Sequence, residues 1–388
     1  MKNKIFSVSV IIIITLFMCN NTYSFNFVEK NINIGIIINT SSFMVECSKN
    51  FFITDVLNKK LSFDQGTIRI FCVEKNTYVN EHILTLPIKI ESLDEIIFIE
   101  SKPYRGYFIV KESNDSKLNV INVLSIEDYI KGVLPKEIGS DWELEALKAQ
   151  AVISRTYAIS NLNKHLSQGF DLCSTTHCQV YGGAGVETDT CNKALLLTQH
   201  EFLTYNRKFA NTVFHANCGG HTENPKYIWN WKIVPPYLKG VKCYYCKNAP
   251  YTNWEKTLDE SFIRKKLLNN NNIGKIKNIK IIDKTNIGTA KKIEILHSNG
   301  KLILNAYKFR LIVDAWQIKS HSFYSIKNYN NKFNFKGKGW GHKVGLCQWG
   351  AKFMAEKGKN YRDILYYFYP GTKISKIIYD DQIKEDKK

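Results

Sequence analysis

The amino-acid sequence predicts an α+β fold with a mixed core, a β-rich leading region and an inserted β-containing lobe. Residues 25–118 alternate short apolar, β-branched runs with Asn, Ser and Gly turns, a pattern typical of strands. Residues 119–254 contain helical periodicity and form the predicted core. Residues 255–330 again contain strand-like runs, and residues 331–388 contain a Gly/Trp motif followed by helices expected to close over the core.

The first 24 residues predict a secretory signal peptide. Lys2 and Lys4 precede an apolar run over residues 5–18, and Thr22 and Ser24 supply the small residues of a cleavage site. The run is shorter than the ~20 residues of a membrane-spanning helix, which favours cleavage over permanent anchoring. We therefore expect an exported protein, in the periplasm or at the outer face of the cytoplasmic membrane. Membrane contact is expected only through an uncleaved signal.

The strands expected in the leading region lie at 34–38, 68–72, 83–90, 96–99 and 107–110. In the lobe, strands are expected at 292–296 and 302–304. Near the end of the chain, residues 351–357 and 361–368 are predicted as short helices, closed by Gly358 and by Pro370 with Gly371.

The first helix of the core is predicted from apolar residues that recur at helical spacing between Ile126 and Val133. Pro135 lacks a backbone N–H and blocks continuation. The first helix is therefore expected to stop near Leu134.

The second helix is predicted to start near Asp141, because Ser140 and Glu143 have the spacing of a capping box. Its apolar face is expected to contain Leu144, Leu147, Ala151 and Ala158, with Lys148, Gln150 and Arg155 elsewhere. Glu137 then lies in the connection between the helices, where functional side chains concentrate. The alternative is a solvated loop acid.

Four sequence blocks follow one another along the chain. Glu137 precedes WELEALKAQAVISRTYA at 142–158; HCQVYGG follows at 177–183, FHANCGGHTEN at 214–224, and a block beginning GKGWGHKVGLCQWGA at 337–374. In this order they resemble the stage II sporulation protein D family of peptidoglycan lytic transglycosylases. NIGIIINT near Asn33 and YRGYFIV near Tyr104 are similar to the family's leading strands, so the resemblance covers most of the chain after the signal.

The resemblance implies that Glu137 is the catalytic acid/base. Such an enzyme cleaves the bond between N-acetylmuramic acid (MurNAc) and N-acetylglucosamine (GlcNAc) without water, here in peptide-free glycan strands, and leaves 1,6-anhydro ends. The acid step requires a protonated carboxyl, so Glu137 is expected to be buried against apolar groups. The nearby helix N-terminus would oppose this. Asp141 and Glu143 are interpreted as first-turn helix acids.

Other functions stay open. The chain could be a non-catalytic, glycan-binding enhancer of a cell-wall amidase, which is a candidate partner under either hypothesis. An amidase that uses zinc ligands is disfavoured, because two of the ligands would be thiols. The net charge of +19 suits a polyanionic wall or reflects a drift toward Lys and Asn. The Lys residues are scattered without a recognised nucleic-acid motif, which argues against nucleic-acid binding.

A metal site is predicted from two imidazoles and two thiols within fourteen positions, the ligand types that zinc prefers. The residues are His165, Cys173, His177 and Cys178. The alternative is a disulfide between Cys173 and Cys178. Some family members carry zinc in this region, and the resemblance implies a structural zinc. No organic cofactor is expected.

A second group of thiols is also predicted. Cys218 and Cys347 stand where the family pattern has Ser, and the chain adds Cys243 and Cys246, so four thiols could converge as a second zinc site or as two disulfides. A further disulfide is expected between Cys47 and Cys72, which leaves Cys191 as an odd thiol.

Glycan contacts are expected from aromatic, amide and imidazole side chains among glycines of the fourth block: Trp340, His342, Gln348 and Trp349. Second-rank candidates, equally consistent with packing, are Arg155, Tyr157, Gln179, Tyr181 and His215. Lys343 stands where the family pattern has Gly and could meet a lactyl carboxylate.

Overall fold

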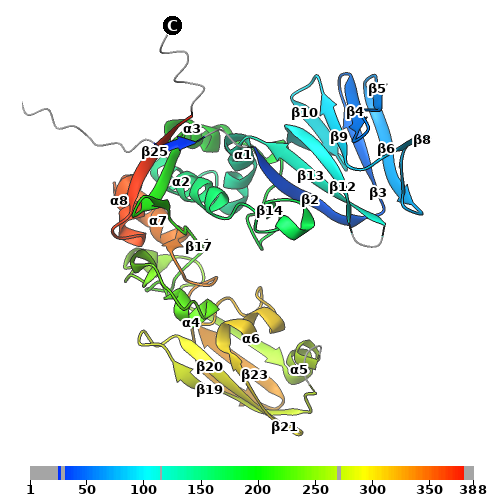
Figure 1. The fold of residues 1–388 in the computed structure, drawn as a ribbon. Helices are drawn as coiled ribbons and strands as arrows, with labels where there is room; N and C mark the ends of the chain where they lie inside the picture. The colour runs from blue at the N-terminus through cyan, green and yellow to red at the C-terminus, as the bar shows by residue number, and fades with distance from the viewer. Residues whose placement is uncertain (1–24, 28–30, 114–115, 269–271, 380–388) are drawn as a thin grey trace, which may run out of the picture.

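The computed structural model describes residues 25–27, 31–113, 116–268 and 272–379, so the predicted signal peptide at 1–24 lies outside it. The fold is α+β, as predicted. Figure 1 shows a β-rich lobe in blue and cyan, a helical centre, and a second lobe in yellow and orange at the other end. Among the described residues, no helix is long and apolar enough to cross a membrane.

The β-rich lobe contains two sheets that bury their inner faces in one apolar cluster. The seven-stranded sheet has the order β14-β2-β13-β12-β9-β4-β5, and the six-stranded sheet the order β11-β10-β3-β6-β7-β8. The bounds are β2 Ile32–Thr40, β3 Ser42–Cys47, β4 Phe51–Asp55, β5 Lys60–Phe63, β6 Gly66–Val73, β7 Asn76–Val79, β8 His82–Leu84, β9 Ile88–Ser92, β10 Ile96–Ile99, β11 Lys102–Arg105, β12 Tyr107–Ser113, β13 Lys117–Leu124 and β14 Leu172–Cys173.

The predicted strands of this lobe are confirmed except for the one at 83–90. That stretch forms β8 in one sheet and β9 in the other, separated by a turn that contains Pro87. Proline has no N–H to donate to a ladder, so one strand does not continue through it.

The predicted Cys47–Cys72 disulfide is wrong. In the β3–β6 ladder Cys47 lies opposite Gly66, whereas Phe71 lies opposite Ser42. Cys72 is therefore six residues along the partner strand from the position opposite Cys47. At ~3.3 Å per residue this separation is roughly 20 Å, far beyond the ~7 Å between Cα atoms that a disulfide tolerates.

The helical centre is built around α2 (Leu144–Ser160), which packs against α1, α3, α7, α8 and β15. The bounds are α1 Ile126–Glu137, α3 Asp189–Leu197, α7 Gln348–Glu356 and α8 Tyr361–Phe368. A four-stranded sheet, β1-β25-β15-β16, joins both ends of the described chain to this centre. Its strands are β1 Phe25–Phe27, β15 Glu201–Tyr205, β16 Lys208–Phe209 and β25 Lys373–Tyr379.

The predicted helix at 361–368 is confirmed as α8, while the helix predicted at 351–357 starts three residues earlier, as α7. The boundaries around Glu137 are wrong. Helix α1 continues through Pro135, because that residue forfeits only one hydrogen bond and the Ile138 N–H still bonds to the Leu134 carbonyl at 3.2 Å. Glu137 is thus the last residue of α1 rather than part of a loop.

The predicted capping box is also absent. Helix α2 begins at Leu144, and its N-cap residue, Glu143, makes no side-chain capping bond. The Glu143 carboxylate instead lies 3.7 Å from the Lys352 ammonium on α7. This ion pair uses the carboxylate that the box would have required.

Helix α2 has no polar face toward solvent along its middle, contrary to the predicted amphipathic pattern. Gln150 and Arg155 are 1% and 0% exposed, because helices and β15 cover the side on which they lie. The Arg155 guanidinium donates to both carboxylate oxygens of Glu127 at 2.7 and 2.8 Å and to the Glu201 carbonyl at 3.2 Å. A buried charge is thereby paired, as its desolvation requires.

The second lobe has its own apolar cluster and two three-stranded sheets, β18-β23-β22 and β19-β20-β21. The elements are β18 Trp254–Asp259, α5 Glu260–Leu268, β19 Ile276–Lys284, β20 Ala290–His297, β21 Gly300–Asn305, α6 Ala306–Val313, β22 Phe323–Tyr329 and β23 Lys332–Gly337. The predicted strands at 292–296 and 302–304 lie within β20 and β21. Trp254 pairs with Gly337, so the chain enters and leaves this lobe on adjacent strands.

Replacing Arg155 with Met is expected to lower the free energy of unfolding by about 3–5 kcal/mol, because the Glu127 carboxylate would stay largely buried without its partner. The matched control is Asp259→Asn in the exposed Lys332–Asp259 pair, which should cost less than about 1 kcal/mol. Urea denaturation followed by Trp fluorescence measures both. Equal losses in the two variants would contradict the role given to the buried pair.

Candidate active site

Glu137 ends α1 with its side chain partly buried. Its Oε1 accepts a hydrogen bond from the Val180 N–H at 2.7 Å. Burial raises the pKa of the Glu137 carboxyl above its ordinary value of 4.5, and the hydrogen bond from Val180 offsets part of this rise. Because the residue lies at the C-terminal end of α1, that helix dipole also favours the protonated form. The dipole of α1 therefore opposes the field that was expected from the N-terminus of α2.

The segment at 177–183 lies directly against α1. The Gly182 N–H donates to the Gly132 carbonyl at 3.0 Å. A Cβ on Gly132 would lie 2.4 Å from a ring carbon of Tyr181 and 2.8 Å from the Gly183 carbonyl oxygen, so only glycine permits this approach. The close packing places the Val180 N–H at the Glu137 carboxyl.

Gln348, the first residue of α7, contacts the C-terminal end of α1 through its side chain. Its Nε2 donates to the Glu137 carbonyl at 2.8 Å and to the Gln150 side-chain oxygen at 3.3 Å. The neighbouring Trp349 ring lies 4.9 Å from the Trp142 ring, centroid to centroid. The predicted residues Gln348 and Trp349 thus flank the turn that follows Glu137.

Among the described residues, no cation forms an ion pair with Glu137. Other acids of this region are paired: Glu127 with Arg155, Glu143 with Lys352 and Glu187 with Arg105. Glu137 therefore combines a raised pKa with freedom from a counter-charge. This combination is typical of an acid that exchanges a proton with a ligand.

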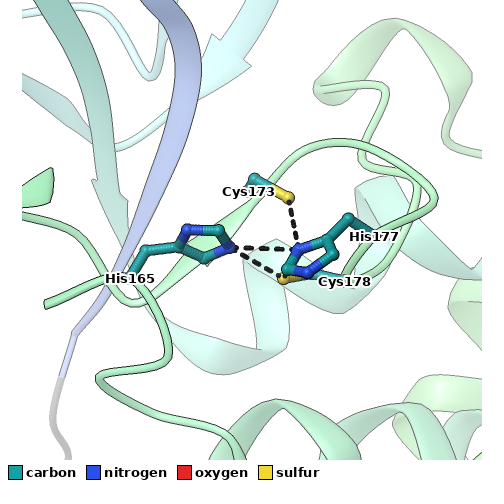
Figure 2. A group of neighbouring side chains, drawn as sticks. All are labelled: His165, Cys173, His177 and Cys178. Carbon is teal, nitrogen blue, oxygen red and sulfur yellow. Dashed lines mark hydrogen bonds between the residues drawn. The ribbon is translucent and has the colours of Figure 1, made fainter. Parts of the chain in front are cut away.

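The four predicted metal ligands converge, as Figure 2 shows. One ligand atom from each of His165, Cys173, His177 and Cys178 lies within 4.8 Å of the others. The His165 Nε2 to His177 Nδ1 distance is 3.2 Å, and the measured sulfur to nitrogen distances are 3.4 to 3.7 Å. A tetrahedral zinc with ordinary bond lengths would need edges of ~3.3 Å between nitrogens and ~3.6 Å between nitrogen and sulfur.

The surroundings orient one of the imidazoles. His165 Nδ1 lies 2.7 Å from the Gln168 side-chain oxygen, which leaves Nε2 as the atom that faces the other ligands. Cys173 and Cys178 are not joined by a disulfide. Cys178 is followed two residues later by Val180, so the cluster is continuous in the chain with the donor to Glu137.

The second predicted group of thiols also converges. The sulfurs of Cys218, Cys243, Cys246 and Cys347 lie within 4.8 Å of one another, and all four residues are buried. None of them forms a disulfide.

Most second-rank glycan candidates are placed as packing residues. Arg155, Gln179, Tyr181 and His215 are at most 6% exposed. Gln179 bonds to the Ser154 carbonyl, and the Tyr181 hydroxyl to Asn122. The Tyr157 hydroxyl accepts from Lys164 at 3.2 Å. These contacts fit the packing alternative that the sequence left open.

Trp340 and His342 lie near the second lobe. The Trp340 ring contacts the Tyr251 and Trp316 rings at centroid distances of 4.9 and 5.8 Å, and the Lys319 ammonium lies 4.6 Å from its centroid. His342 packs against Trp229 at 5.0 Å. Sequence analysis missed Tyr251, Trp316 and Lys319, because they lie outside the four blocks and no local pattern marks them.

The expected contact of Lys343 with a lactyl carboxylate is contradicted by its position. Lys343 is 3% exposed, and its ammonium donates to the Ser322 hydroxyl at 2.9 Å. Its backbone φ of 66° lies in the left-handed region, which explains why glycine suits this position.

The comparisons with known proteins include several matches to stage II sporulation proteins. A profile described as a stage II sporulation protein matches residues 114–205, and one described as a domain of unknown function matches residues 237–345. The chain is 31% identical to stage II sporulation protein D of Bacillus subtilis over 284 residues, which cover 69% of this chain and 78% of that protein.

Two other proteins are also similar in sequence to this chain. An uncharacterized protein of Brachyspira hyodysenteriae is 37% identical over 272 residues, 70% of this chain and 72% of the relative. The amidase enhancer of Bacillus subtilis is 27% identical over 406 residues, with 91% of this chain and 54% of the relative covered.

A Gly132→Ala change is expected to lower the free energy of unfolding by about 1–3 kcal/mol, because the added methyl overlaps the Tyr181 ring. The control is Lys193→Ala at an exposed position of α3, where the change should stay within about 0.5 kcal/mol. Thermal denaturation by circular dichroism measures both. A wild-type melting temperature for Gly132→Ala would show that 177–183 does not pack on α1 as described.

Proposed function

The chain belongs to the stage II sporulation protein D family, and from this premise we propose that it is an exported peptidoglycan lytic transglycosylase with Glu137 as its acid/base. One observation carries the proposal: Glu137 is an acid with a raised pKa, held by one backbone donor and free of any ion pair among the described residues. A catalytic acid needs these properties, whereas a solvated surface acid lacks the burial that raises the pKa.

The proposed reaction uses Glu137 twice. The protonated carboxyl donates its proton to the glycosidic oxygen as the bond from MurNAc C1 to that oxygen breaks, and GlcNAc leaves with a hydroxyl. The resulting carboxylate then takes the proton of the MurNAc 6-hydroxyl, while the oxygen of that hydroxyl attacks C1. The product carries a 1,6-anhydro ring, and Glu137 ends protonated as it began. Because the nucleophile belongs to the substrate, a second carboxylate is unnecessary.

The neighbours of Glu137 suit this cycle. The Val180 N–H occupies Oε1, while Oε2 accepts no hydrogen bond from any residue that the structure describes. Oε2 is therefore the oxygen available for substrate. Gln348 fixes the backbone of Glu137 rather than its carboxyl, so it positions the acid without holding it in the charged form.

The substrate in this proposal is glycan without stem peptides. Such strands expose the lactyl carboxylate of each muramic acid, and the net charge of +19 would attract a strand of that charge. The Trp142–Trp349 pair offers ring faces beside Glu137 for sugar packing.

The His165, Cys173, His177 and Cys178 cluster is proposed to hold a structural zinc. Four protein ligands close the coordination sphere, so the ion would supply a crosslink rather than a site for water. The residues themselves fix the loop that leads to Val180. His165 directly precedes η1 (Leu166–Gln168), Cys173 ends β14, and His177 and Cys178 begin the segment 177–183.

A second candidate function is enhancement of a cell-wall amidase by a chain that binds glycan without cutting it. Similarity to the amidase enhancer across 91% of this chain favours it. The raised pKa and free oxygen of Glu137 have no use in a binding protein, and for this reason we place the transglycosylase first.

A Glu137→Gln variant is expected to release anhydromuramic ends from purified denuded strands at least ~10²-fold more slowly than the wild type, because the amide cannot donate or accept the transferred proton. The matched control, Glu143→Gln, changes an acid that is paired with Lys352 and should retain activity. Mass spectrometry of the digests provides the measurement. Unchanged release by Glu137→Gln would refute the catalytic role, whereas stimulation of an amidase by both proteins without any release would support the enhancer.

The pH dependence follows from the raised pKa of Glu137. The acid step needs the protonated form, whose population falls as pH rises through that pKa. We therefore expect kcat/KM to fall with rising pH in a limb whose midpoint lies above 4.5, the ordinary value. A limb centred at or below 4.5 in initial-rate measurements on soluble glycan would show that burial does not act as described.

A further inference from the structure

The second thiol cluster lies in the helical centre, on chain segments that precede and follow the second lobe. Cys218 follows β17 (Phe214–His215), and Cys347 ends β24 (Leu346–Cys347), which pairs with β17 in parallel. Cys243 and Cys246 flank the start of η4 (Tyr245–Asn248), shortly before β18 enters the lobe. Three chain segments that are distant in sequence therefore meet at four sulfurs.

The arrangement of these sulfurs differs from that of two disulfides. A disulfide needs sulfurs ~2.05 Å apart, whereas Cys218 and Cys246 are 3.4 Å apart and all four sulfurs lie within 4.8 Å of one another. A tetrahedral zinc with bonds of ~2.3 Å would separate its sulfurs by ~3.8 Å. Two disulfides would instead divide the group into two close pairs.

Two backbone donors and a buried cation lie near the sulfurs. The Cys347 sulfur accepts from the Cys218 N–H at 3.2 Å and from the Gly350 N–H at 3.4 Å. The buried Lys343 interacts electrostatically with Cys218, Cys246 and Cys347, and also with the Glu223 carboxylate. A zinc ion with four thiolates carries a net charge of minus two, and a buried cation with backbone donors compensates such a charge.

We propose that Cys218, Cys243, Cys246 and Cys347 bind one structural zinc ion that ties the segments before and after the second lobe to the core. The site is independent of the His165 cluster and of the transglycosylase proposal. It lies next to the candidate active site in the chain, because Cys347 caps α7 and the next residue, Gln348, donates to the Glu137 carbonyl. Zinc at this position thus fixes the start of α7.

The first experiment uses the wild-type mature chain, purified with a reductant and without chelator. Native mass spectrometry and elemental analysis are expected to find two zinc ions per chain. Replacement of zinc by Co²⁺ should give the intense sulfur-to-cobalt absorption of a thiolate-rich tetrahedral site. A chain without zinc, or an intact mass lower by the hydrogens lost in two disulfides, would overturn the proposal whether or not any variant folds. If one zinc is found, the paired variants below show which cluster holds it.

Paired variants assign the ions. Cys243→Ser with Cys246→Ser is expected to lose one zinc and keep the other, and His165→Ala with His177→Ala should lose the other one. If the Cys243→Ser/Cys246→Ser variant loses both ions, circular dichroism shows whether that variant is still folded. A folded Cys243→Ser/Cys246→Ser protein that retains two zinc ions would contradict the assignment.

Discussion

The contact between residues 177–183 and α1 is the constraint on which the candidate site depends. Glycine at 132 lets the two segments touch backbone to backbone, and this approach brings one N–H, that of Val180, to the carboxyl of Glu137. A longer side chain at 132 would move the donor away and open the carboxyl to water. Burial and one hydrogen bond then act in opposite directions on the same pKa, and burial prevails.

The rest of the centre maintains this contact. Helix α2 is buried from Ala149 to Ala158 and carries Arg155, whose ion pair with Glu127 ties it to α1. Helix α7 contributes Gln348 from the opposite direction. The His/Cys cluster ends where 177–183 begins, and the four-thiol cluster ends where α7 begins. Each of the two sets of potential metal ligands therefore lies directly before a segment that touches Glu137.

The sequence predicted the fold class, most strands and the His/Cys cluster, because periodicity and Cys/His spacing are local signals. The four-thiol group was predicted from the resemblance, because Cys218 and Cys347 depart from the family pattern. It misplaced both helix ends around Glu137. Pro135 costs one hydrogen bond in a last turn that packing still supports, and Glu143 pairs with Lys352, which lies more than two hundred residues away. Tertiary partners of this kind leave no trace in a local pattern.

The candidate site residues also divide into those whose role local sequence patterns predict and those whose role depends on tertiary contacts. Arg155, Gln179 and Tyr181 belong to the recognised blocks, yet they are buried and bonded within the core. The donor to Glu137 is a backbone N–H, which no residue type reveals.

The proposed function requires that Glu137 drives cleavage without water. Digestion of denuded glycan in H₂¹⁸O is the direct test of this requirement. The expected products are 1,6-anhydromuramic ends without ¹⁸O. Reducing MurNAc ends that contain ¹⁸O, or intact strands, would refute cleavage by this route.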